Sequence, residues 1–305
     1  MPSRPPSRAA SAWALPWVLV RQSVVAWIDD DAASKGAALA YYTLFSLAPL
    51  LLIVISVAGL VFGAEAARGE IFGQLQGLVG APGAAAVQGL LESVNRPADG
   101  WAATALGVVL MLVGATTVFA ELQNTLDRIW RAPERPAGGL WQLLRARVLS
   151  FGLILGLGFL LMVSLVASAA LAALQRWWAP QFLGWSQALA VLDQASSFAL
   201  VTLLFAMIYK LMPRVRIHWT DVWVGALVTA ALFAIGRLLL GAYLGLAAVS
   251  AGFGAAGSLV VVLVWVYYSA QVFLLGAEFT WVYAHVLGSR RPAAAAVGLD
   301  VVKAG

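Results

Sequence analysis

The stretch RLLLGAYLGLAAVSAGFGAAGSLVVVLVWVYYSAQVFLLGAE, residues 237–278, decides the fold of this chain. The 40 residues between Arg237 and Glu278 carry no charge, whereas a helix needs only about 20 apolar residues to cross a bilayer core of roughly 30 Å. The sequence SAGFG at 250–254 divides the stretch into the end of one helix and most of another. We therefore expect the chain to cross a membrane twice in this region.

The composition of the whole chain agrees with this expectation. Of its 305 residues, 62% are hydrophobic and 11% are charged, and the mean hydropathy is +0.88. An ordinary soluble domain has about 45–50% apolar and about 25% charged residues, so a water-soluble globule is excluded. The chain has no cysteine, which excludes disulfides, thiolate metal sites, iron–sulfur clusters and a cysteine nucleophile. We expect no cofactor.

Further uncharged runs predict the remaining spans. Runs of 29, 21 and 28 residues occupy 36–64, 100–120 and 148–175, and the segment 187–211 is apolar apart from Asp193. The predicted fold class is an all-α, polytopic membrane protein with an N-terminal interfacial helix and short outer amphipathic helices. Its six transmembrane helices are expected at 37–62, 101–121, 149–173, 187–211, 222–247 and 257–284.

The distribution of basic residues predicts the orientation of these spans. Lys and Arg collect in short cytoplasmic loops. With both termini cytoplasmic, the inner segments hold most of the 19 basic residues, the outer segments hold only Arg68, Arg96 and Arg176, and Arg237 lies within a span. We therefore predict a multi-pass membrane protein with both termini on the cytoplasmic side. This topology accounts for the pI near 9.8 without a nucleic-acid partner.

The chain is expected to divide into three parts. Residues 1–36 form a cytoplasmic segment with an interfacial helix, 37–286 form the membrane domain with an outer amphipathic cap at 64–100, and 287–305 form a mobile cytoplasmic tail. The interfacial helix is expected from Pro16 to about Ile28, and it either lies in the lipid interface or packs under the bundle. One of its faces carries Trp17, Val20, Val24 and Trp27, and Arg21 lies near the other.

Ionisable groups within the spans are the main functional candidates, because a charge in the membrane is costly unless it is paired or hydrated. At a rise of about 1.5 Å per residue, Asp193 and Arg237 lie about 10 and 15 Å below the outer face. These depths allow a salt bridge. It would either fix the helix register or contribute to gating or substrate contact.

Two polar stripes are further candidates. Tyr267, Gln271 and Glu278 fall within an arc of about 60° on the last span, because each residue turns about 100°. Glu121 and Glu278 are expected at similar depth near Lys210 and Arg214, either in a static network or lining an inner vestibule. The second stripe consists of Thr117, Glu121, Asn124 and Arg128.

Catalysis and metal binding are not expected. The two histidines, His218 and His285, lie next to predicted interfaces and are read as interfacial side chains. The run at 29–31 is three adjacent aspartates, which cannot all face one metal, and is read as a solvated cap. The sequence at 252–257 matches G-x-G-x-x-G but follows no strand, so a dinucleotide site is rejected. We predict that the protein is not an enzyme.

Proline and glycine positions predict local geometry. Pro49 should kink the first span because it removes a backbone hydrogen bond. The pairs Gly152/Gly156 and Gly241/Gly245 allow close helix approach, either within the chain or in a homo-oligomer.

Three segments together are similar to a known family. They are KGAALAYYTLFSLAP at 35–49, FAELQNTLDRIW at 119–130, and GAAGSLV at 254–260 continuing through WVYYSAQ at 265–271 to GAEF at 276–279. The chain resembles the YihY/BrkB family of bacterial membrane proteins from about Trp17 to His285. The resemblance implies six inner-membrane spans with cytoplasmic ends. The family that the chain resembles has carried a ribonuclease label and a serum-resistance virulence label, and it is often suspected of transport.

We expect transport or permeation of a small solute, ion or lipid-like molecule across the bilayer. The alternative is a non-transporting scaffold for envelope homeostasis or virulence that recruits partners through its basic inner loops. A ribonuclease is disfavoured, because the sequence offers no cluster of metal ligands.

Overall fold

The structure is a computed structural model, and it describes 14–44, 46, 63, 65, 68–69, 71–73, 76, 84–85, 87–89, 117–133, 185–246 and 257–291. Within these residues the only regular secondary structure is helix. This agrees with the predicted all-α fold class. The predicted third span, 149–173, the Pro49 kink and Gly152/Gly156 lie outside the described residues.

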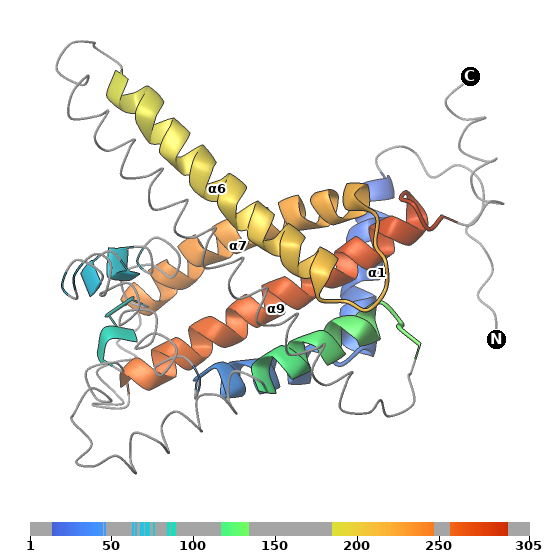
Figure 1. Cartoon of the computed structure of the whole chain (residues 1–305), viewed down its shortest axis with the longest axis horizontal. Helices are drawn as coiled ribbons and strands as arrows, with labels where there is room; N and C mark the ends of the chain where they lie inside the picture. The colour runs from blue at the N-terminus through green and yellow to red at the C-terminus, as the bar shows by residue number, and fades with distance from the viewer. Residues whose placement is uncertain are drawn as a thin grey trace.

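Three long helices form the centre of the described fold: α6 (Trp185–Leu211), α7 (Trp219–Leu246) and α9 (Gly257–Val286). Each contains a stretch long and apolar enough to cross a membrane, namely Gln194–Leu211, Trp219–Ala242 and Val260–Val286. They coincide with the last three predicted spans. Helix α7 packs against both α6 and α9, and successive helices run in opposite directions (Figure 1).

Helices α6, α7 and α9 meet in a seam built from two tyrosines, two threonines and three glycines. The buried Tyr209 hydroxyl of α6 donates to the Phe273 carbonyl oxygen of α9 at 2.7 Å and lies 3.1 Å from Thr229 Oγ1 of α7. A methyl group added at Gly276 would overlap the Thr229 hydroxyl. Small residues let membrane helices approach in this way. The other two glycines repeat the pattern: Gly225 faces Thr280, and Gly236 faces Tyr268.

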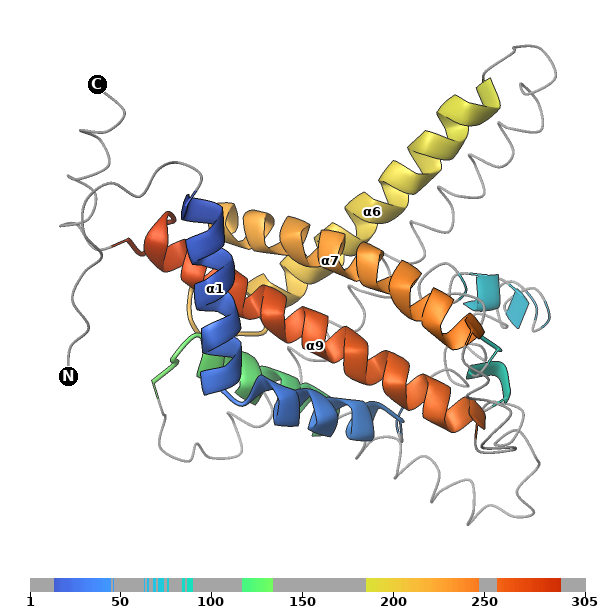
Figure 2. The same ribbon diagram turned by 180° about the vertical axis from the view of Figure 1, so that it is seen from behind.

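Helix α1 (Ala14–Asp29) lies across the C-terminal part of α9 (Figure 2). It matches the predicted interfacial helix and packs against the bundle through one face, where Leu19 and Ser23 are buried. Its other side exposes apolar residues, among them Trp17 at 69%. The two interpretations of this helix are therefore compatible. The other large apolar side chains that it exposes are Val20, Val24, Val25 and Ile28.

The two ends of the described helices differ in composition. At one end, helical turns within 65–89 pack Ile71, Phe72 and Val87 against the end of α7 and the start of α9 (Figure 1). The amphipathic cap predicted at 64–100 falls mostly outside the described residues and stays a prediction. At the other end, which we call the basic end, α1, 117–133, the α6–α7 loop and the end of α9 come together. Its basic residues are Arg21, Lys35, Arg128, Arg131, Lys210, Arg214, Arg216, Arg290 and Arg291.

Candidate functional site

The candidate site is organised by a sharp turn between α1 and the helix at 32–44. We call this turn, Asp30 and Asp31, the elbow. Asp31 has a φ of 55°, a left-handed conformation that Asp tolerates better than most residues, and its side chain accepts a hydrogen bond from Ser34 at 2.9 Å. Its carbonyl oxygen accepts the Lys35 N–H at 3.2 Å, the first turn of the new helix.

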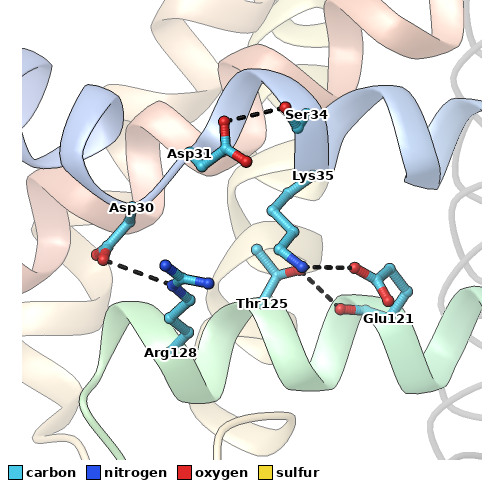
Figure 3. A network of polar contacts seen from close by, with 7 residues as sticks. All are labelled: Asp30, Asp31, Ser34, Lys35, Glu121, Thr125 and Arg128. Carbon is cyan, nitrogen blue, oxygen red and sulfur yellow. Dashed lines mark hydrogen bonds and ion pairs between the residues drawn. The ribbon is translucent and has the colours of Figure 1, made fainter.

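Two ion pairs join the helix at 117–129 to the elbow and the helix that follows it (Figure 3). Lys35 Nζ lies 3.4 Å from Glu121 Oε1, and Arg128 Nε lies 3.8 Å from Asp30 Oδ1. Thr125 donates to the Glu121 carbonyl oxygen at 2.8 Å. Both pairs are partly exposed, so each contributes little to stability, about 0–1 kcal/mol. Their effect is to hold the two helices in register.

Helix α9 contacts the start of the helix that follows the elbow. Gln271 Nε2 donates to the Ala33 carbonyl oxygen at 3.2 Å. Gly36 faces the Gln271 amide so closely that a methyl group there would overlap it. Gln271 and Glu278 are seven residues apart and therefore share one face of α9. We call the whole assembly the polar junction: Asp30, Asp31, Ser34, Lys35, Glu121, Thr125, Arg128, Gln271 and Glu278.

Glu278 is the most deeply buried acid of the polar junction. It is 1% exposed, and neither of its carboxyl oxygens has a hydrogen-bond partner among the described residues. Its carboxyl faces that of Asp30, with Asp29 and Arg131 also within electrostatic reach. Asp30 Oδ2 and Gln271 Oε1 are likewise buried and unpartnered. Buried oxygens of this kind cost about 1–3 kcal/mol each, so they call for an explanation.

Aromatic rings and further pairs surround the polar junction. The Arg131 guanidinium lies over the Trp281 ring at 5.0 Å, and that ring also packs against His285 at 4.4 Å. Asp127 accepts the Arg214 N–H at 2.8 Å and pairs with Arg214 Nε at 3.1 Å. Burial raises the pKa of the Asp127 carboxyl, and Arg214 opposes that rise. These contacts stabilise the turns at the basic end.

Two predicted neighbours of the carboxylates have other partners. Lys210 donates to the Ile217 carbonyl oxygen and lies 5.3 Å from the Trp219 ring. Arg214 binds Asp127. The prediction that these cations lie beside Glu121 and Glu278 was therefore wrong, because the tight α6–α7 loop turns Lys210 back onto its own backbone. Glu121 is neutralised by Lys35 instead.

The remaining candidates lie outside the polar junction. Asn124 is exposed, and Tyr267 is 38% exposed although it shares the stripe of Gln271 and Glu278. Arg237 is half-buried in the middle of α7. The side chain of Asp193, in α6, is not among those described, so its pairing with Arg237 stays a prediction.

Two contributors to the polar junction, Asp30 and Lys35, were not singled out as site residues from the sequence. Asp30 was read as part of a solvated cap, but it is half-buried and paired with Arg128. Lys35 was counted among the inner basic residues and begins the family segment at 35–49, but no partner was predicted for it. Nothing in the local sequence pattern indicates that Asp30, Ala33 and Gly36 all lie against α9. Among the described residues, no group of three His, Cys, Asp or Glu side chains could hold a metal ion.

The apolar helices, their glycine-mediated packing and the charged end define an integral, multi-pass membrane protein. Comparison with known proteins agrees. The sequence profile of the family described as virulence factor BrkB matches residues 24–298, and the chain belongs to this family. The resemblance drawn from the three motifs is thereby confirmed.

Curated relatives carry only general names. A UPF0761 membrane protein from Alkalilimnicola ehrlichii is 29% identical over 276 residues, covering 87% of this chain and 58% of the relative. One from Pseudomonas aeruginosa is 30% identical over 260 residues, covering 82% and 59%. One from Neisseria meningitidis serogroup B is 29% identical over 234 residues, covering 76% and 53%. The chain thus spans less than three fifths of these relatives. No solved structure matches it.

Proposed function

We propose that this membrane protein moves a small solute, ion or lipid-like molecule across the bilayer without catalysing a chemical reaction, and that the polar junction takes part in that movement. The observation that carries the proposal is Glu278, an acid 1% exposed in a helix able to span the membrane, with both carboxyl oxygens unpartnered among the described residues. Ionisable groups in such helices are expensive and usually serve ion or substrate pathways.

The position of the polar junction supports this role. It lies where α1, 117–129 and α9 converge at the basic end, and its ion pairs are partly exposed. Partly exposed ion pairs cost little to break. The pairs near Glu278 can therefore open to admit water to this acid and close again to exclude it. Movement of the elbow would uncover Glu278, and it would also separate Ala32 and Leu39 from the apolar cluster that includes Leu274 and Ala277.

A liposome assay tests the proposal. Purified full chain is reconstituted in phosphatidylethanolamine/phosphatidylglycerol liposomes, and flux is followed for protons, Na⁺, K⁺ and a fluorescently labelled phosphatidylglycerol. We expect at least one probe to move faster than in protein-free liposomes, and Glu278→Gln to slow it. If no probe moves with folded wild-type protein and Glu278→Gln has no effect in cells, the proposal is overturned.

A scaffold is the second candidate function. The observation favouring it is the set of exposed arginines at the basic end, which include Arg128, Arg214 and Arg216. Such a surface suits an acidic partner protein. In-cell crosslinking that captures one stable partner, lost when the basic residues between 128 and 147 are neutralised, would support the scaffold and count against transport. RNA cleavage by purified protein would contradict both.

We propose that the basic end faces the cytoplasm of a bacterial inner membrane, with both chain ends on that side. The excess of Lys and Arg at this end supports the orientation. Because the chain has no cysteine, single substitutions such as Ser289→Cys and Gly73→Cys report topology without background. A membrane-impermeant maleimide added outside intact spheroplasts should label Gly73→Cys and spare Ser289→Cys. The reverse pattern would overturn the orientation.

A further inference from the structure

We propose that Glu278 and Asp30 form a proton-binding site, in which one proton is shared between the two carboxyl groups. The two acids come from different elements, α9 and the elbow, and their carboxyls face one another. The ligand is therefore a proton held between two helices. The site requires no cargo, but its use in coupling, described below, rests on the proposed function.

The unpartnered oxygens carry the argument. Glu278 Oε1 and Oε2 and Asp30 Oδ2 are all buried without a hydrogen-bond donor among the described residues. Two ionised carboxylates offer only acceptors, so neither could satisfy the other. With one proton present, the O–H of one carboxyl donates to an oxygen of the other, forming the strong bond typical of a carboxylic acid and a carboxylate. A shared proton thus gives partners to oxygens that otherwise have none.

The charged groups around the pair fit a single negative charge. From the elbow side, Asp29 adds negative charge, and Arg128 binds the outer oxygen of Asp30. From 117–133, Arg131 lies within electrostatic reach of Glu278, but its guanidinium is stacked on Trp281. Two negative carboxylates removed from water repel each other, so ionising both is costly, whereas a single negative charge beside these arginines is stabilised.

Titratable groups of α6, α7 and the end of α9 have hydrogen-bond partners other than Glu278. Asp221 of α7 accepts from Ser289 Oγ at 2.5 Å, and Lys210 of α6 binds the Ile217 carbonyl oxygen. On α9 itself, His285 Nδ1 lies 2.8 Å from the Trp281 carbonyl oxygen. None of these contacts supplies a donor to Glu278, so the proton remains the simplest partner.

A metal cation fits the pair less well than a proton. Calcium, for example, takes about six to eight oxygen ligands. Two carboxyl groups cannot provide that number, and the Arg131 charge would repel a cation. The described residues also contain no cluster of three metal-ligating side chains.

Loss of the shared proton would move the elbow relative to α9. When the proton passes to water, two carboxylates are left facing each other, and their repulsion pushes the elbow away from α9. The contacts resisting this are the Gln271 bond to the Ala33 carbonyl oxygen and the burial of Ala32 and Leu39 in one apolar cluster with Leu274 and Ala277 of α9. Protonation would close the junction and deprotonation would open it.

Infrared spectroscopy tests the site without any cargo. Full-length protein in phosphatidylethanolamine/phosphatidylglycerol nanodiscs is compared at neutral pH as wild type, Glu278→Gln, Asp30→Asn and Glu121→Gln. We expect a carbonyl-stretching band of a protonated carboxylic acid that shifts in D₂O. The band should disappear in Glu278→Gln, change frequency in Asp30→Asn and remain in the matched control, Glu121→Gln, whose acid is paired with Lys35.

The outcomes separate this proposal from the transport proposal. A wild-type spectrum identical to that of Glu278→Gln overturns the proton site, as does a band lost only in Glu121→Gln. Glu278→Gln resembles the neutral acid in shape and should fold at neutral pH. Failure to recover it folded counts against the proton site, and Asp30→Asn still tests the band. A band without flux would leave the proton site standing and remove the transport proposal.

Discussion

The seam of α6, α7 and α9 and the polar junction differ in how their buried polar groups are paired. In the seam, the Tyr209 hydroxyl has two partners, and Thr229 and Thr280 each donate to a carbonyl oxygen four residues earlier at 2.7 Å. In the polar junction, the Glu278 oxygens have no partner among the described residues. Unpaired polar groups are costly where water is absent. The seam therefore contributes to stability, whereas the unpartnered oxygens of the polar junction cost stability.

Glycine substitution in the seam should have the largest effect. Gly276→Val is expected to lower the free energy of unfolding by about 3 kcal/mol, because its side chain would overlap the Thr229 and Tyr209 hydroxyls. Gly241→Val is the matched control in α7, where an added methyl meets no described atom. Thermal unfolding in nanodiscs measures both. Equal losses of stability in the two variants would show that the seam is packed no more tightly than the surroundings of Gly241.

Replacing the buried acid Glu278 should change the free energy of unfolding in the opposite direction. Glu278→Met is expected to raise the free energy of unfolding by about 1–2 kcal/mol, because it replaces a buried carboxyl group by an apolar side chain of similar volume while Asp30 keeps its ion pair with Arg128. The same thermal unfolding assay applies. A loss of stability as large as that of Gly276→Val would mean that Glu278 belongs to the structural framework, and the contrast between the two regions would fail.

Removing one hydroxyl from the seam should have a moderate effect. Tyr209→Phe is expected to lower the free energy of unfolding by about 1 kcal/mol, because the Phe273 carbonyl oxygen and the Thr229 hydroxyl lose a partner. Ring packing against Phe205 and Phe273 is retained. Phe205→Leu, which disturbs the packing alone, is a useful comparison. No change in Tyr209→Phe would contradict the assigned hydrogen bonds.

The smallest effect is expected at the Lys35–Glu121 pair. Side-chain exposures of 32% and 22% leave the pair screened by solvent. A double-mutant cycle with Lys35→Met and Glu121→Gln should therefore give a coupling energy of about 0.5 kcal/mol or less. A coupling well above that would show that the polar junction is held more rigidly than we infer.

The spans and the junction were predictable from the sequence to different extents. The uncharged runs located α6, α7 and α9 to within a few residues, since lipid demands long apolar helices. Helical spacing placed Gln271 and Glu278 on one face. The partners of those residues were not predictable, because they depend on the elbow at Asp30 and Asp31, which folds α1 back across α9. Such long-range contacts leave no local periodicity.

The seam was missed for a related reason. Tyr209 lies in an apolar stretch where nothing in the local pattern distinguishes it from an exposed tyrosine such as Tyr267. Its role comes from Gly276, 67 positions later, which lets α9 approach its hydroxyl. Neither residue alone indicates the contact.

Flux through reconstituted liposomes tests the central claim most directly. For whichever probe the wild type moves, Glu278→Gln should reduce the rate about tenfold or more, equivalent to roughly 1.4 kcal/mol, while Tyr209→Phe at matched incorporation should retain it. That result would assign activity to the polar junction and stability to the seam. Wild-type flux in Glu278→Gln, or loss of flux in Tyr209→Phe alone, would contradict the account.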